Sequence, residues 1–188
     1  VKADLARNGA NFHQNLVPSF GNPASDLMLT AGLNGSITES PIPMGRIAAT
    51  NPNHVSWYLN KVIQHENPVP NTSSSPYGET DWMKQALHFA GGDDASSASQ
   101  FMGYLNGYKN TLEDDYFGGN VRSYAKTSTA PIQTTMSDSI RNAIGNGVAL
   151  MTFFGHASAT GGFDQNIDNP VDWPNQNGKY PFLLGNAC

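Results

Sequence analysis

Two stretches of this chain are apolar at almost every position, Val148–Phe154 (VALMTFF) and Tyr180–Leu184 (YPFLL), and a glycine follows each. A strand with one face in water alternates polar and apolar residues, whereas a strand covered on both faces does not have to. Two shorter strands are predicted at Lys84–Ala90 and Asn120–Tyr124. Since helical segments separate these strands, we expect an α/β fold with a mainly parallel sheet flanked by helices.

The helices are predicted from apolar residues at helical spacing. One runs from about Ser97 to Asp115, and a second follows Ser137-Asp138 and ends at Gly145-Asn146-Gly147. A third begins with Asn53 as its cap and stops at Pro68. Glycine, proline and asparagine interrupt the first forty residues too often for regular elements, so we expect a loop-rich start and a domain that begins upstream of Val1.

The charge balance excludes several classes of partner. Only 13% of residues are charged, the net charge is −5, and no run of basic residues occurs, which argues against nucleic acid and against an anionic membrane surface. No window approaches 18 apolar residues, so no membrane span is expected, and residue 1 does not begin a signal peptide. Polarity from neutral side chains rather than charges suits an extracellular or surface protein.

The chain has a single cysteine, Cys188, which excludes an internal disulfide and a cysteine-rich zinc site. Ligands and catalytic groups gather at the carboxyl ends of the strands in open parallel sheets. Three predicted strand ends have reactive side chains: Asp93, His156 and Cys188. A thiol beside an imidazole is the basis of a cysteine nucleophile, and a carboxylate can orient the ring.

Each of these residues also has a structural interpretation. A lone cysteine after an apolar strand can be buried filler, and His156 can be a structural histidine. Asp94 is as good a candidate as Asp93 for the carboxylate. The backbone N–H groups of Ala157 and Cys188 are candidate oxyanion donors, because both residues lie where a strand becomes a loop.

The remaining polar residues do not predict a cofactor site. His13, His54, His65 and His88 show no ligand spacing, so no metal is expected. An oxygen-rich loop lacks the spacing of a known calcium loop, which favours a solvated loop; it contains Asp164, Asn166, Asp168, Asn169 and Asp172. Arg46 is interpreted as a structural ion pair with Asp26, and Trp173, between the histidine and cysteine segments, as a substrate-pocket residue.

The ordered set of segments resembles the gingipain-like cysteine peptidases of the caspase–legumain fold group. Gly155-His156 after an apolar strand and Gly185-Asn186-Ala187-Cys188 after the next are similar to that family's histidine and cysteine segments. Earlier segments are also similar and occur in the family's order; they are Val17-Pro18-Ser19-Phe20-Gly21, Ser25-Asp26, Ile42-Pro43-Met44-Gly45-Arg46-Ile47, His65-Glu66 and Gln85-Ala86-Leu87.

The resemblance implies Cys188 as nucleophile, His156 as general base and acid, and Asp93 as the third member, where the gingipains have Glu. It implies a caspase-like three-layer sandwich, incomplete at both ends, in a single domain fragment over residues 1–188. Residues 1–45 would be a loop-rich lead-in and residues 46–188 the sheet-and-helix body. One departure is Ala157, because the family usually has glycine directly after its catalytic histidine.

The expected function is that of a secreted or outer-surface cysteine endopeptidase of a Gram-negative bacterium, or a sortase-like transpeptidase of the type IX secretion system. Its partners would be a protein or peptide substrate and the remainder of the same polypeptide beyond residue 188, with no cofactor required. Two alternatives stay open. One is a catalytically silent homologue that serves as a structural or binding domain, and the other is a carbohydrate-binding domain that uses Trp57, Trp82 or Trp173.

Overall fold

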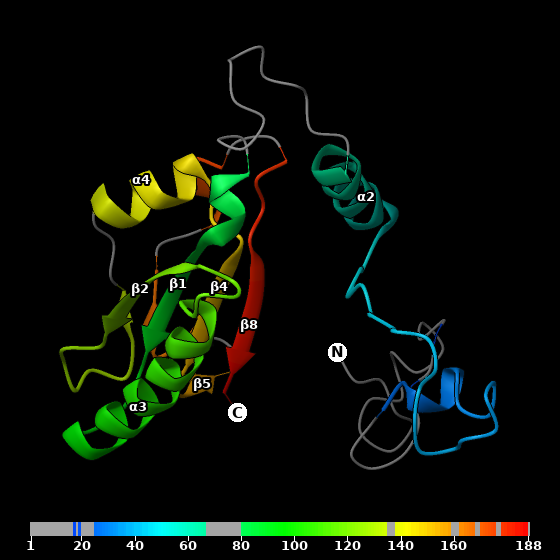
Figure 1. Ribbon diagram of the computed structural model, residues 1–188, viewed down its shortest axis with the longest axis horizontal. Coiled ribbons are helices and arrows are strands. Elements are labelled where there is room, and N and C mark those ends of the chain that lie inside the picture. The colour runs from blue at the N-terminus through cyan, green and yellow to red at the C-terminus, as the bar shows by residue number, and fades with distance from the viewer. Residues whose placement is uncertain are drawn as a thin grey trace. The chain divides into compact units, whose positions relative to one another are not determined.

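The computed structural model describes residues 17, 19, 25–66, 80–134, 138–158, 162–167, 170–175 and 178–187. The chain divides into two compact units, Val1–Trp57 and Tyr58–Cys188. The sheet and the helices that cover it lie in the second unit (Figure 1). The predicted division into a lead-in at residues 1–45 and a body at residues 46–188 stays a prediction.

Among its described residues, the first unit contains the short 3-10 helix η1 (Leu27–Leu29) and the beginning of a longer helix that starts at Pro52. Arg46 binds Asp26 with two hydrogen bonds, Nε to Oδ2 at 2.9 Å and Nη2 to Oδ1 at 2.5 Å, and Nη1 donates to the carbonyl of Val17 at 2.6 Å. The Arg46 hydrogen bond lowers the pKa of Asp26. The predicted Arg46–Asp26 ion pair is thus confirmed. Together with its hydrogen bond to Val17, Arg46 joins three separate loop segments.

Helix α2 (Pro52–Glu66) begins one residue before the predicted cap. The Asn51 side chain accepts hydrogen bonds from the backbone N–H groups of Asn53 and His54, at 3.0 and 3.3 Å. The prediction of Asn53 as the cap is therefore wrong by two residues. Pro52 occupies the first turn, where proline lacks only a donor that would be unpaired there anyway.

The main sheet has four strands in the order β2-β1-β4-β8. They are β1 (Gln85–Ala90), β2 (Asn120–Ala125), β4 (Leu150–Phe154) and β8 (Phe182–Asn186). All three pairings are parallel, and the arrowheads of β1 and β8 point the same way in Figure 1. The predicted mainly parallel α/β sheet is confirmed.

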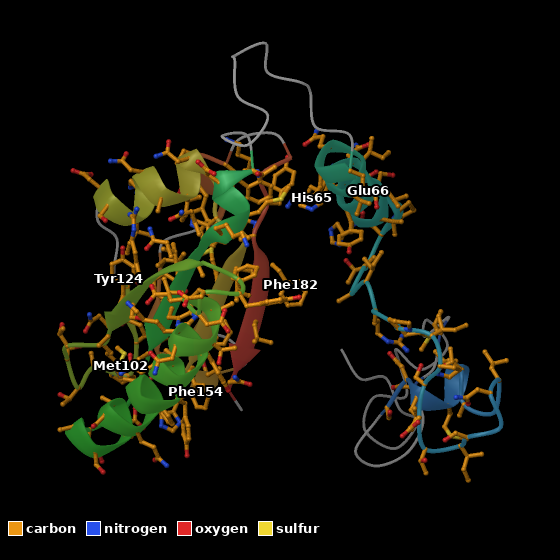
Figure 2. The ribbon with its side chains drawn as sticks, in the orientation of Figure 1. His65, Glu66, Met102, Tyr124, Phe154 and Phe182 are labelled. Carbon is orange, nitrogen blue, oxygen red and sulfur yellow. The ribbon has the colours of Figure 1, made fainter. Side chains whose placement is uncertain are left out.

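Two helices cover opposite faces of this sheet. The face that presents Leu87, Phe89, Met151 and Phe153 packs against Ile140, Ala143 and Ile144 of α4 (Asp138–Asn146), which are all buried. The alternate residues face α3 (Ala95–Leu112), where Phe154, labelled in Figure 2, lies; its ring contacts those of Phe101 and Tyr104. The result is a three-layer sandwich.

The short elements are η2 (Asp81–Lys84), β3 (Gln133–Thr134), β5 (Ala157–Ser158), β6 (Gly162–Phe163), β7 (Gln165–Asn166) and η3 (Pro170–Asp172).

The last strand lies two residues later than predicted. The prediction placed it at Tyr180–Leu184, but β8 begins at Phe182, whose side chain projects from the sheet (Figure 2). The ladder starts where the Phe182 N–H donates to the Ala149 carbonyl at 2.8 Å, two residues after the apolar run begins. Gly185 and Asn186 continue the pairing, opposite Phe153 and Phe154, instead of ending it.

A row of stacked aromatic rings crosses the core. Tyr124, Phe89 and Phe153 come from the paired positions of β2, β1 and β4, and Phe163 of β6 continues the row. The ring centroids are separated by 5.4, 4.8 and 4.6 Å in that order, with interplanar angles of 18, 12 and 9°. This row fixes β6 against the main sheet.

Among the described residues, no helix is both long and apolar enough to cross a bilayer.

Candidate active site

The four strands end at the same level of the sheet. Their last residues pair in one row: Ala125, Ala90, Phe154 and Asn186. The next backbone N–H groups continue the ladder, since Lys126 donates to Ala90 at 2.8 Å and Gly91 to Phe154 at 2.8 Å. Gly155 likewise donates to Asn186 at 3.2 Å. Side chains on the loops that follow are therefore brought to one edge.

His156 lies at this edge, two residues after β4 ends. Its backbone N–H donates to Asp164 Oδ1 at 3.0 Å, and its carbonyl accepts from the Asp164 N–H at 2.9 Å. The ring meets Phe101 of α3 edge to face, with centroids 5.4 Å apart at 71°. The side chain is 45% exposed, so one side of the imidazole is open to a substrate.

The structure brings Asp93 to His156. Asp93 Oδ2 is 3.7 Å from His156 Nε2, which is ion-pair distance but longer than a hydrogen bond. The Asp93 side chain is 68% exposed, and its backbone N–H donates to Ser97 Oγ at 3.1 Å. The two groups that the sequence placed at separate strand ends are thus neighbours.

Asp94 is used differently. It is the N-cap of α3, and its carboxylate accepts from the Ser97 N–H at 2.8 Å while Ser97 Oγ accepts from the Asp94 N–H at 3.2 Å. The hydrogen bond from the Ser97 backbone is the main cause that lowers the pKa of Asp94, and positive charge on His156 contributes least. A carboxylate held in a capping box is not free to turn toward the imidazole.

Ala157 begins β5, which pairs antiparallel with β6 and places Ala157 opposite Phe163. Since the Asp164 N–H donates to the His156 carbonyl beside this pair, Ala157 and Phe163 are a non-hydrogen-bonded pair and the Ala157 N–H points out of the ladder. Every described residue with positive φ is a glycine, so Ala157 adopts an ordinary extended conformation. Alanine fits this position without strain.

Cys188 lies outside the described residues. The chain that leads to it is described, because Asn186, two residues before Cys188, pairs with Phe154, two residues before His156. The histidine and cysteine segments therefore leave adjacent parallel strands at the same level.

Trp173 is half-buried and packs against the core cluster. It lines a groove with Ala149 and Phe182, which lie at the beginning of β4 and β8, the end opposite His156. The structure does not bring Trp173 beside Asp93, and its role in substrate binding stays a prediction.

Asp164 was predicted as part of a solvated loop, but it is buried, with 4% exposure. Besides the His156 N–H, its carboxylate accepts from the backbone N–H of Gly92 at 2.7 Å and of Gln165 at 3.0 Å. It therefore joins the loop that contains Asp93 to the loop that contains His156. No local pattern indicates this role, because Asp164 and Gly92 are 72 positions apart in the chain.

Lys126 is a second residue that sequence reasoning missed. Its side chain is 0% exposed, and Nζ lies 3.6 Å from Asp164 Oδ2 and 3.9 Å from Asp93 Oδ1. A signal for it existed. The strand-end rule that selected Asp93 and His156 selects Lys126 when it is applied to the strand at Asn120–Ala125.

The oxygen-rich loop around Asp164 is only partly described, since Asp168 and Asn169 lie outside the described residues. Asp172 is exposed in η3, and the Asp164 carboxylate is occupied by backbone donors. Within the described ranges, no three histidine, cysteine or acidic side chains are grouped to hold a metal.

Comparisons with known proteins identify a family and a solved structure of similar fold. The model of peptidase family C25 matches residues 3–188. A search of curated protein sequences finds no significant match. The fold is similar to the crystal structure of the arginine-specific cysteine proteinase gingipain R, with a TM-score of 0.59 and 20% identity over 92% of this chain. This chain spans 38% of that protein, and at this identity the likeness shows the fold alone. The family match over nearly the whole chain shows that it belongs to peptidase family C25, the gingipain family of cysteine peptidases.

Proposed function

We propose that this chain is the peptidase segment of a cysteine endopeptidase that hydrolyses peptide bonds through a thioester. The observation that supports this best is the pairing of His156 with Asp93 at the edge where β8 leads to Cys188. An imidazole beside a carboxylate, on the strand next to a cysteine segment, is an arrangement that can activate a cysteine nucleophile. Membership of a cysteine peptidase family agrees with it.

The proposed mechanism assigns one role to each group. His156 accepts the proton of the Cys188 thiol, and the thiolate attacks the scissile carbonyl to form a tetrahedral intermediate. The imidazolium then protonates the leaving amine as the C–N bond breaks, which leaves a thioester on Cys188. Water, deprotonated by His156, hydrolyses the thioester and restores the thiol. Since Asp93 faces Nε2, Nδ1 is the ring nitrogen that would exchange protons with Cys188.

The backbone N–H groups of Ala157 and Cys188 would stabilise the oxyanion. The outward direction of the Ala157 N–H and its extended backbone support this assignment. No step needs a metal or an organic cofactor, so we propose that the reaction runs without one.

The finer assignments follow from the family resemblance. We propose a secreted or outer-surface location and a protein or peptide substrate. A sortase-like transpeptidase would use the same thioester and differs only in resolving it with an amine instead of water. Product analysis with an added amine nucleophile separates the two reactions.

The single cysteine allows a direct test. A peptidyl chloromethyl ketone that alkylates thiols can react with cysteine only at Cys188. We expect the folded protein to be labelled faster than urea-denatured protein, and His156→Ala to remove the difference. Equal or slower labelling of the folded protein would contradict the proposal. The Cys188→Ser variant controls for reaction at other groups.

One observation favours a catalytically silent homologue as a second candidate. Asp93 is well exposed and 3.7 Å from the imidazole, which is looser than a formed hydrogen bond. A silent domain would bind peptides without turnover. Incubation with a peptide library, followed by mass spectrometry for cleaved products and by a binding assay, distinguishes the two candidates.

A further inference from the structure

Lys126 places an ammonium group where water does not reach. Its side chain is 0% exposed, and its Nζ has no acceptor within hydrogen-bond distance among the described residues. Burial of an ammonium is costly unless opposite charges compensate for it. Two carboxylates do so at ion-pair distance, Asp164 at 3.6 Å and Asp93 at 3.9 Å.

The Asp164 carboxylate is held in place by its surroundings. Backbone N–H groups of Gly92 and His156 donate to it from two different loops. Its space is also closed, because a Cβ atom on Gly91 would lie 1.9 Å from Oδ1 and one on Gly155 would lie 2.3 Å from the same atom. A fixed carboxylate fixes the ammonium beside it.

The Asp93 carboxylate is not held in this way. It is 68% exposed, whereas the Asp164 side chain is 5% exposed. Asp93 contacts the ammonium through Oδ1 and faces His156 through Oδ2. One oxygen attracted to a fixed positive charge leaves the other oxygen directed at the imidazole.

We propose that Lys126 is a positioning residue of the peptidase site, whose buried ammonium, anchored by Asp164, holds the Asp93 carboxylate against His156. The inference rests on the proposed function for its catalytic consequence. It concerns a contact with Asp93, which a purely structural Lys126–Asp164 pair would not need.

The first test measures the contact without requiring activity. The imidazole resonances of His156 are identified as those that disappear from the NMR spectrum of His156→Gln. They are then recorded for Lys126→Met, Asp93→Asn and the double variant. We expect Lys126→Met to shift these resonances when Asp93 is present and to shift them much less in the Asp93→Asn background. Equal shifts in both backgrounds overturn the proposal.

The second test measures the consequence for chemistry with the same chloromethyl ketone. We expect Lys126→Met to lower the limiting labelling rate constant by at least about tenfold. The apparent affinity for the probe should stay within about twofold, because Lys126 acts through Asp93 rather than on the probe. An equal loss in the Asp93→Asn background overturns the proposal.

Two further variants keep the result interpretable. Lys126→Gln removes the charge but retains a polar NH₂ group, so it replaces Lys126→Met if that variant fails to fold. Lys109→Met is the matched control, since Lys109 Nζ is also paired with a carboxylate, Glu113 at 3.6 Å, but lies on α3. It should leave the His156 resonances unchanged. The chloromethyl ketone can fail to label the wild-type protein while the effect of Lys126→Met on the His156 resonances still depends on Asp93. In that case the proposed function fails and the Lys126–Asp93 contact stands.

Discussion

Gly185 of β8 lies against the ring of Phe163, so closely that a Cβ atom at position 185 would be 2.6 Å from Phe163 Cζ. Phe163 stacks on Phe153 at 4.6 Å and directly precedes Asp164. The glycine that precedes Asn186-Ala187-Cys188 therefore makes room for the aromatic row, and the row places the residue that anchors the His156 loop.

The first prediction concerns this contact. Gly185→Ala should destabilise the protein by about 1–3 kcal/mol, because the added methyl group must displace the Phe163 ring. Urea unfolding followed by circular dichroism measures the change. Gly107→Ala is the control, since Gly107 lies within α3 with nothing within 4 Å of its added Cβ. That substitution should stabilise the helix by about 0.5–1 kcal/mol. The packing argument would be contradicted if Gly185→Ala left the free energy of unfolding unchanged or raised it, as Gly107→Ala is expected to do.

The sheet could be predicted from sequence because its signal is local. Val148–Phe154 and Lys84–Ala90 have the composition of strands buried on both faces, and the strand-end rule then selects Asp93 and His156. The start of β8 was misplaced because the apolar run begins at Tyr180, whereas the ladder begins with the hydrogen bond from the Phe182 N–H to the Ala149 carbonyl. The strand pairing itself, not the residue types, determines that β8 continues through Gly185.

The support of the site could not be predicted in the same way. The Asp164–Gly92 hydrogen bond joins residues 72 positions apart. The sequence around a loop aspartate such as Asp164 looks the same whether its carboxylate is solvated or buried. Its burial depends on the β5–β6 pairing and on the ring of Phe163, which are contacts between segments and leave no local signal.

The second prediction concerns the buried carboxylate. Asp164→Asn should destabilise the protein by about 3–5 kcal/mol, since it leaves the Lys126 ammonium without its closer counter-ion. An amide also puts an NH₂ group against the N–H of either Gly92 or His156, which both donate to the present carboxylate. Chemical denaturation measures the loss. Asp172→Asn, at an exposed position of η3, should change stability by less than about 0.5 kcal/mol. Similar losses for both variants would contradict the anchoring role.

The third prediction separates the two neighbouring aspartates. Asp93→Asn should lower the labelling rate of Cys188 by about tenfold or more, because the imidazole loses its carboxylate. It should destabilise the protein less than Asp164→Asn does, because the closer carboxylate of Asp164 stays beside the Lys126 ammonium. Asp94→Ala should leave the labelling rate nearly unchanged, with a loss of about 1 kcal/mol of stability from the missing N-cap. Labelling kinetics and urea unfolding are measured on both variants. A larger labelling defect in Asp94→Ala would assign the carboxylate role to Asp94 instead.

The fourth prediction concerns His88, which is 0% exposed in the middle of β1. Burial is the largest cause that lowers its pKa below the usual 6.5, and Lys109 of α3 lowers it further. The Leu105 main chain and the Glu113 carboxylate act in the opposite direction. The unfolded chain therefore binds a proton at His88 more readily than the folded protein does.

The sign of the pH dependence follows. Well above pH 6.5 His88 is neutral in both states and contributes no pH dependence; as the pH falls through 6.5 the unfolded state gains a proton first, and stability falls. The slope from this one group cannot exceed about 1.4 kcal/mol per pH unit. Urea unfolding between neutral pH and pH 5 should show this decline in the wild-type protein and a smaller one in His88→Leu. Thr152→Val is the matched control, because Thr152 is buried opposite His88 on β4 and does not titrate, so it should keep the wild-type slope. If His88→Leu keeps that slope as well, the acid sensitivity arises elsewhere in the protein.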